Sequence, residues 1–358
     1  MKRREWIVGL IVLAALAGLF AYEQHLHPFD WRVFLEEFRK ANWGKVCLGA
    51  GLIYLAFVLR AARWAWLLRP SKRVPLFSLL GTQVMGFTAI ALIGRIADLV
   101  RPYLVAKKTG LPVGSQIAVY IVERLFDAGS MAILLCSAIL LSPPGTLPHQ
   151  EIFNRFGKGG LVATAAGALF LFAVRLSGSA IASFCEKILA PLSQKLAHAF
   201  GQKIRTFHAG LDTLHSPKDF AVTLTLSLVM WTMITMAYVE GAGAFMPQGQ
   251  ENSMAMAKCL ALMAGGGVAS IVQLPVIGWF TQIAALEVML RPLFGMSSET
   301  AMACATTLLA ITFLSVAPVG LVWAQFEHIN LRRVTLESEH AGEDLEDEET
   351  ADPAAAPQ

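Results

Sequence analysis

The stretch GRIADLVRPYLVAKKTG, residues 94–110, determines the predicted architecture of the chain, because it carries charge directly after an apolar run. The run before it, residues 77–93, is apolar but short and contains several small or polar residues. A charge at the centre of a membrane helix costs roughly 2.5–3.5 kcal/mol. If the stretch lies at membrane depth, its charges therefore need partners. Its charged residues are Arg95, Asp98, Arg101, Lys107 and Lys108.

The composition of the whole chain indicates a membrane protein. Of its 358 residues, 55% are hydrophobic and 15% are charged, whereas a soluble domain carries about 25% charged residues. Several apolar runs approach or exceed the ~20 residues that a membrane-spanning helix needs. The five cysteines are scattered and form no CxxC pair. Neither a disulfide framework nor a metal site is therefore expected, and no cofactor is expected.

Six apolar segments are candidates for full crossings of the bilayer. The first could also be a signal peptide, because a basic start precedes it. We favour a retained helix, since the rest of the chain also lies in the membrane. Residues 28–43 place Trp31, Phe34, Leu35 and Phe38 at helical spacing, which predicts an amphipathic helix on the membrane surface. The six candidate spans are residues 7–22, 46–68, 114–141, 159–176, 219–245 and 300–326.

The distribution of Lys and Arg predicts the orientation of these segments. All basic clusters fall on the cytoplasmic side only if residues 77–107 enter and leave the membrane from the cytoplasmic face. The same reasoning makes residues 255–294, which Pro275 interrupts, a second re-entrant hairpin from the outer face. The prediction is an all-α, polytopic membrane bundle with about six full spans and two re-entrant hairpins, similar to an inverted-repeat transporter. Both termini would be cytoplasmic.

The predicted membrane domain covers residues 1–333, and an acidic tail follows it. Within the domain, residues 180–217 form a polar connector on the cytoplasmic side. Residues 334–358 contain nine acidic residues and neither Lys nor Arg, so this tail is predicted to be disordered. It could bind a protein partner, although a solvated tail is the simpler interpretation.

A second charged motif, VERLFD at residues 122–127, lies inside the next predicted span. Glu123 and Asp127 are four residues apart and therefore lie on one helical face. Together with the first motif, it supplies three cations and three anions that can neutralise one another. One interpretation is a purely structural ion-pair network. The other is a cavity lining in which arginines bind an anionic headgroup, since a guanidinium binds phosphate with two hydrogen bonds.

Other polar residues in apolar surroundings are further candidates. Arg60 either snorkels to the cytoplasmic interface or belongs to the headgroup site, and snorkelling is the favoured interpretation of Arg63. Glu287 follows the interruption at Pro275 and either faces a pore or is a satisfied interfacial carboxylate. The sequence contains no nucleophile motif, phosphate-binding loop or metal-ligand spacing. An enzyme is therefore not expected.

These residues resemble sequence blocks of the lysylphosphatidylglycerol synthase transmembrane-region family, also called flippase-like membrane proteins, over roughly residues 5–328. RAARWAWLL at residues 60–68 is similar to the family's Arg-Trp helix end, and VERLFD is similar to its Glu-Arg…Asp helix. Residues 94–112 resemble its Pro-Gly-Arg-x-Gly-Asp/Glu block, with Ile93 and Ala97 in place of the Pro and the second Gly. The second hairpin departs from the family, because Gln282 and Ile283 occupy places usually held by Arg and Glu.

The resemblance implies movement of a lipid between leaflets, either an anionic or aminoacylated phospholipid or an isoprenoid-type lipid. The alternative is a non-catalytic scaffold or accessory subunit of a lipid or envelope biosynthesis complex. Membrane lipids are the expected partners, nucleic acid is not, and the inner (cytoplasmic) membrane is the expected location. The candidate headgroup residues are Arg95, Arg101 and Arg60. The supporting ion-pair residues are Asp98, Glu123, Arg124 and Asp127. The candidates in the second hairpin are Gly278, Trp279 and Glu287.

Overall fold

The computed structural model describes residues 29–142, 216–247, 255–269 and 277–330, together with single residues between 151 and 194 and between 334 and 337. Helices make up the elements in these ranges, which confirms the predicted helical class. The predicted span at 7–22, and most of the predicted span at 159–176 and of the 180–217 connector, lie outside the described residues. Among the described residues, five helices are long and apolar enough to cross a membrane. They are α3 (Trp43–Leu68), α4 (Leu76–Ile93), α6 (Val113–Leu141), α9 (Pro217–Gly243) and the continuous helix Ser298–Phe326.

Local signals in the sequence set the ends of the helices. The side chain of Asp30 caps α2 (Trp31–Lys40), and that of Asn42 caps α3. Ser216 and Asp219 form a reciprocal capping box at the start of α9. Such side chains satisfy the free N–H groups of a first helical turn. The helix boundaries in the described ranges therefore follow closely from the local sequence.

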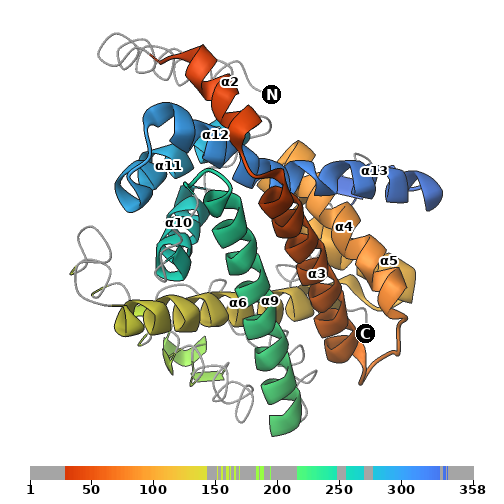
Figure 1. Cartoon of the computed structure of the whole chain (residues 1–358). Coiled ribbons are helices and arrows are strands. Elements are labelled where there is room, and N and C mark those ends of the chain that lie inside the picture. Colours follow the sequence, from red (N-terminus) through yellow and green to blue (C-terminus); the bar gives the residue numbers. More distant parts are fainter. Residues whose placement is uncertain are drawn as a thin grey trace, which may run out of the picture.

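The antiparallel pair of α3 and α9 forms the centre of the bundle. At one end, Asn42 N donates to Ala244 O at 2.9 Å. Gly49 lets α3 approach α9 closely, since a Cβ there would lie 3.1 Å from Ala237 O. Figure 1 shows α6 passing across this pair, with α4 and α5 (Val100–Thr109) on one side and α10 (Ala255–Ala269) and α11 (Ile277–Phe294) on the other.

The first charged stretch forms the second half of a helical hairpin. α4 ends at Gly94, which has φ 93°, and a 3₁₀ segment (Arg95–Leu99) leads into α5. Glycine is the residue that adopts this backbone conformation without a steric penalty. The two arms are antiparallel, because Lys108 Nζ donates to Ser78 O at 3.3 Å and Lys72 Nζ donates to Thr109 O at 2.6 Å. The hairpin therefore begins and ends on the same side of the molecule.

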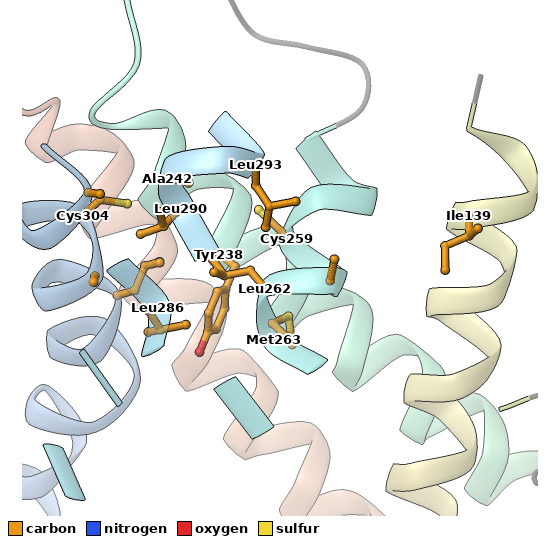
Figure 2. Packing of buried hydrophobic residues seen from close by; sticks show 14 residues of the cluster. Ile139, Tyr238, Ala242, Cys259, Leu262, Met263, Leu286, Leu290, Leu293 and Cys304 are labelled. Atoms are coloured by element: carbon orange, nitrogen blue, oxygen red, sulfur yellow. The ribbon is translucent and has the colours of Figure 1, made fainter. Parts of the chain in front are cut away.

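The second hairpin consists of α10 and α11. Its arms are also antiparallel, because Lys258 Nζ lies 5.4 Å from the Phe294 ring centre and Gly266 faces Leu286. Figure 2 shows the apolar side chains of these arms facing one another, with Tyr238 of α9 beside them. These contacts bury thioether, thiol and aliphatic side chains in one cluster. The hydrophobic effect therefore holds the second hairpin on α9 and α12 (Ser298–Leu309).

A π-helical segment, η3 (Ala310–Leu314), interrupts the last long helix between α12 and α13 (Val316–Phe326). α12 packs with α10, α11 and α9, whereas α13 packs on α4. The contact between α13 and α4 is very close, because a Cβ on Gly320 would overlap Thr88 and would lie 3.0 Å from Val84 O. The π segment therefore joins α12, which packs with the second hairpin, to α13, which packs with the first hairpin.

The two ends of the described part of the chain contain α2 and a short piece of the acidic tail. The amphipathic segment predicted at 28–43 contains α2, whose Trp31 is 56% exposed and which packs on α12. The sequence predicts disorder from residue 334, but Val334 and Thr335 are helical and each only 4% exposed. Glu337 accepts a hydrogen bond from Tyr103 at 3.1 Å. Val334 packs in a cluster with residues of α4, α5 and α13.

Candidate functional site

A stripe of polar side chains on α6 forms the base of the candidate site. Its members are spaced alternately four and three residues apart and therefore share one face of the helix. Most of them are buried inside the bundle rather than facing the membrane. The stripe comprises Gln116, Tyr120, Glu123, Asp127 and Ser130.

Glu123 is the acceptor at the centre of the site. Its Oε1 lies 2.6 Å from Arg63 Nη2 and 3.3 Å from nitrogens of Arg60, Arg101 and Arg124. Its Oε2 accepts from Trp64 Nε1 at 2.7 Å. A fully buried carboxylate is tolerated only when it is paired and hydrogen-bonded. The four arginines and Trp64 meet that requirement.

Asp127 forms a second centre one turn further along α6. Its Oδ1 accepts from Arg63 Nη1 at 2.7 Å and from Trp231 Nε1 at 3.1 Å, and its Oδ2 lies 2.8 Å from Arg124 Nη2. Arg63 also donates to Ser227 Oγ at 2.6 Å. Arg63 thus joins α3, α6 and α9 through three short contacts. Snorkelling, the interpretation favoured from the sequence, is wrong for this residue, because Arg63 is 0% exposed.

Aromatic rings hold the arginines without cancelling their charge. The Phe87 ring lies 4.7 Å from the Arg60 guanidinium carbon and 4.9 Å from that of Arg101. The Tyr120 ring lies 5.0 Å from the guanidinium carbon of Arg101 and 5.2 Å from that of Arg124. Cation–π contact attracts a guanidinium but leaves its net charge in place. The rings therefore fix the arginines in position while they stay positively charged.

A cavity of about 300 Å³ lies in front of this cluster. Both hairpins, α3, α6, α9 and the π segment contribute to its wall. One part of the wall is charged and the remainder is apolar or carries neutral polar groups. The charged residues in the lining are Arg60, Asp98, Arg101 and Arg124, and the neutral polar ones include Tyr120, Trp231, Tyr238, Gln282 and Thr312.

Arg101 has hydrogen-bonding capacity left over at the cavity. Its Nη1 donates to Gln83 Oε1 at 3.0 Å and contacts Glu123, but Nε and Nη2 have no hydrogen-bond partner among the described residues. Gly86 makes this position possible, because a Cβ there would overlap Arg101 Cγ. Buried polar groups are rarely left without partners. Nε and Nη2 of Arg101, which together carry three N–H donors, are therefore available to acceptor oxygens.

The second hairpin reaches the first one near the point where each is interrupted. Trp279 Nε1, near the start of α11, donates to Ala91 O at 2.9 Å, close to the end of α4. Gly278 is buried beside it. One turn further on, Gln282 borders the cavity and its Oε1 has no hydrogen-bond partner in the described part of the chain. Glu287 accepts from Ser298 at 2.9 Å and is not among the residues that line the cavity.

The structure brings together most of the residues that the sequence singled out. Arg60, Arg101, Arg124, Glu123 and Asp127 form one cluster. Asp98 borders the cavity but makes no direct ion pair with a described side chain, and the side chain of Arg95 is outside the described part. The geometry of Glu287 is that of the satisfied carboxylate. Within the described residues, no group of His, Cys, Asp and Glu could hold a metal ion.

Sequence reasoning missed several members of the site. These are Arg63, Trp64, Gln116, Tyr120 and Ser227. A signal for the α3 members was present, since Arg60, Arg63 and Trp64 share the three- and four-residue spacing of one helical face. The α6 members continue the spacing of Glu123 and Asp127 in both directions.

Comparison with known protein families gives a match over most of the chain. The family model described as "Lysylphosphatidylglycerol synthase TM region" matches residues 6–320. That range includes both hairpins and every residue that lines the cavity. No curated protein and no solved structure matches the chain.

Proposed function

Since the chain belongs to the lysylphosphatidylglycerol synthase TM region family and is a multi-pass membrane protein, we propose that it moves a lipid between the two leaflets of the bilayer. One observation carries the proposal. A cavity between two helical hairpins is bordered by three arginines, and one of these, Arg101, has free N–H groups. An anionic headgroup supplies acceptors for these N–H groups.

The chemistry of the cavity suits a lipid phosphate in particular. A guanidinium stays charged and presents its N–H groups in a fork that matches two phosphate oxygens. The guanidinium carbons of Arg60 and Arg101 lie 4.7 and 4.9 Å from the centre of the same Phe87 ring, which places the two groups close enough together for such contact. Glu123 and Asp127 lie behind the arginines and hold them in position. The ion-pair network and headgroup binding are therefore two roles of one cluster.

The proposed arrangement in the membrane makes both hairpins re-entrant. In support, the first hairpin returns to its starting side, where Lys72 contacts Thr109 and Lys108 pairs with Glu327 at 2.6 Å. This side would be cytoplasmic, because basic residues concentrate on the cytoplasmic side of membrane proteins. The opposite side, where α2 and the start of α12 lie, would face outward. Both termini would then be cytoplasmic, in the inner membrane of the cell.

Movement of the headgroup would follow from rocking of two groups of helices against each other. One group is the first hairpin with α13, and the other is the second hairpin with α12. The two groups meet at the cavity, and the π segment that joins α12 to α13 contributes Thr312 and Phe313 to its wall. π segments are frequent at functional sites and places of bending in helices. The acyl or prenyl chains would stay in the bilayer while the headgroup crosses. No covalent chemistry is part of the proposal.

Reconstituted vesicles provide the test. The protein is placed in phosphatidylcholine vesicles that contain phosphatidylglycerol with a fluorescent NBD acyl chain, and dithionite quenches the probe in the outer leaflet. The wild-type protein should expose the inner-leaflet probe to quenching over time. Arg101→Ala should slow this movement about tenfold to a hundredfold, which is the range expected for losing one charge-assisted hydrogen bond.

The matched control is Arg291→Ala, because Arg291 lies on α11 and does not line the cavity. It should move lipid at the wild-type rate. If Arg101→Ala inserts and folds normally but moves lipid as fast as the wild type, Arg101 is not a headgroup residue. If the wild-type protein moves no lipid and instead copurifies with a stoichiometric protein partner, the scaffold function replaces the proposed one.

A further inference from the structure

We infer that the cavity prefers a lipid with one phosphate charge and an uncharged, hydroxyl-bearing headgroup, and that Gln282 recognises the hydroxyl. This inference rests on the proposed function and narrows its substrate class. It depends on three properties of the cavity: its charge, the unpartnered amide oxygen of Gln282, and its size.

The first property is the net charge of the cluster. Among the side chains that the structure describes, four arginines stand against three carboxylates, which leaves one positive charge. Because charge in a low-dielectric interior is stabilised only when it is compensated, a ligand with a single negative charge suits the cluster best. An added ammonium group on the headgroup would cancel the phosphate charge and leave the positive charge of the cluster uncompensated. The cluster comprises Arg60, Arg63, Arg101, Arg124, Asp98, Glu123 and Asp127.

The wall that faces the second hairpin adds to this preference. The described lining residues from α9, α10 and α11 include no carboxylate that could pair with an ammonium group. Among the lining residues that the structure describes, the one carboxylate is that of Asp98, which precedes α5 on the arginine side. A positively charged headgroup would therefore find three arginines and a single acid. This arrangement disfavours an aminoacylated lipid.

Gln282 supplies the second property, an amide on this neutral wall whose oxygen has no partner among the described residues. It is 6% exposed and borders the cavity, and its Oε1 has no hydrogen-bond partner among the described residues. A side-chain amide both donates and accepts, which suits a hydroxyl group because a hydroxyl also does both. A buried polar atom without a partner costs free energy until a ligand satisfies it. Gln282 is thus placed to bind the uncharged part of the headgroup.

The third property, the size of the cavity, agrees with a small headgroup. Its volume of about 300 Å³ is at the lower limit of ligand pockets, which range from about 300 to 1,000 Å³. A glycerol phosphate is among the smallest headgroups that combine one negative charge with hydroxyl groups. A headgroup that carries several sugars would not fit.

The test compares two NBD-acyl probes in the same vesicle assay, phosphatidylglycerol and its lysyl ester. The wild-type protein should move phosphatidylglycerol faster. Gln282→Leu should slow the movement of phosphatidylglycerol about threefold to tenfold, as expected for the loss of one neutral hydrogen bond, without accelerating the lysyl ester. Gln282→Glu adds a carboxylate to the neutral wall and should shift the preference toward the lysyl ester.

Thr223→Val is the matched control, because Thr223 is also buried, its hydroxyl has no hydrogen-bond partner in the described structure, and it does not line the cavity. It should leave the ratio of the two rates unchanged. Equal rates for both probes in the wild type, or an unchanged phosphatidylglycerol rate in Gln282→Leu, would overturn the inference and leave the proposed function standing. If neither probe moves faster than in protein-free vesicles, the proposed function itself fails.

Discussion

Arg60 and Arg63 lie one turn apart on α3 but have different environments. Arg63 is fully buried and makes contacts of 2.6–2.7 Å with Glu123, Asp127 and Ser227. Arg60 borders the cavity, and its ion pairs with the two carboxylates are longer, at 3.3 and 3.6 Å. Removing one partner from a buried, closely paired charge is strongly destabilising, whereas a cavity-facing guanidinium is available to a ligand. The two arginines should therefore differ in role.

Replacement of each arginine by methionine separates these roles. Arg63→Met should destabilise the protein by about 3–5 kcal/mol, because it leaves a buried carboxylate pair short of a partner. The corresponding fall in Tm is roughly 10 °C. Arg60→Met should lower Tm less but should reduce lipid movement more. Thermal denaturation in detergent, with the vesicle assay alongside, measures both. An equal loss of stability in the two variants would contradict this division.

The sequence predicts the charged residues of this cluster better than their partners. The charges of the motif at 122–127 balance those of the stretch at 94–110, which predicts that the two stretches pair. Arg101 does contact Glu123. The place of Arg63 does not follow from the sequence, because spacing gives the face of a helix but not which neighbour covers it. Its position near the end of an apolar run favours snorkelling. The close crossing of α3, α6 and α9 buries it instead.

At the scale of helices, close packing between α4 and α13 joins the first hairpin to the end of the chain. Gly320 lies against Thr88 and Val84 with no room for a side chain, and Gly81 lies against Trp323. Small residues at such contacts let two helices approach closely, which is how membrane helices gain packing energy. The close approach of α13 thus depends on these glycines.

A pair of glycine substitutions tests this packing. Gly320→Ala should destabilise the protein by about 1–3 kcal/mol, because the added methyl group has no space and the helices must separate. Gly51→Ala is the control, since Gly51 is exposed on α3 and a Cβ added there would have no neighbouring atom within 4 Å. It should be neutral or stabilising by up to about 1 kcal/mol, because alanine favours a helix. Equal Tm values for the two variants would contradict the packing account.

Helix positions follow from the sequence more fully than helix contacts do. The apolar runs and capping residues predict the described spans, and Gly94 marks the interruption of the first hairpin. The π segment is not predicted, because nothing in residues 310–314 distinguishes it from ordinary helix. The contact between the two hairpins through Trp279 and Ala91 is also beyond the sequence, since it depends on tertiary packing.

For the whole molecule, two ends can be distinguished by their contacts. One end brings together α2, the start of α3 and the start of α12, where Thr300 donates to Glu37 at 3.3 Å. The other end brings together Lys72, Lys108 and Glu327. In the proposed arrangement the first end faces outward and the second faces the cytoplasm. The inverted-repeat relationship between the hairpins stays a hypothesis.

Cysteine labelling tests the orientation. In a background without the native cysteines, Lys107→Cys and Arg39→Cys each place one exposed thiol, at opposite ends of the molecule. A membrane-impermeant maleimide applied to intact cells should label position 39 and should label position 107 only after the membrane is opened. Labelling of position 107 from outside would show that residues 77–107 cross the membrane once instead of returning.

Native mass spectrometry of the purified protein tests the central claim most directly, namely that the cavity arginines hold a lipid headgroup. The wild-type protein and Arg291→Ala should retain an anionic phospholipid after detergent exchange. The double variant Arg60→Met, Arg101→Met should retain much less of it while staying folded, because it lacks two of the three cavity-lining arginines. Retention of the same lipid in the same amount by the folded double variant would contradict the account.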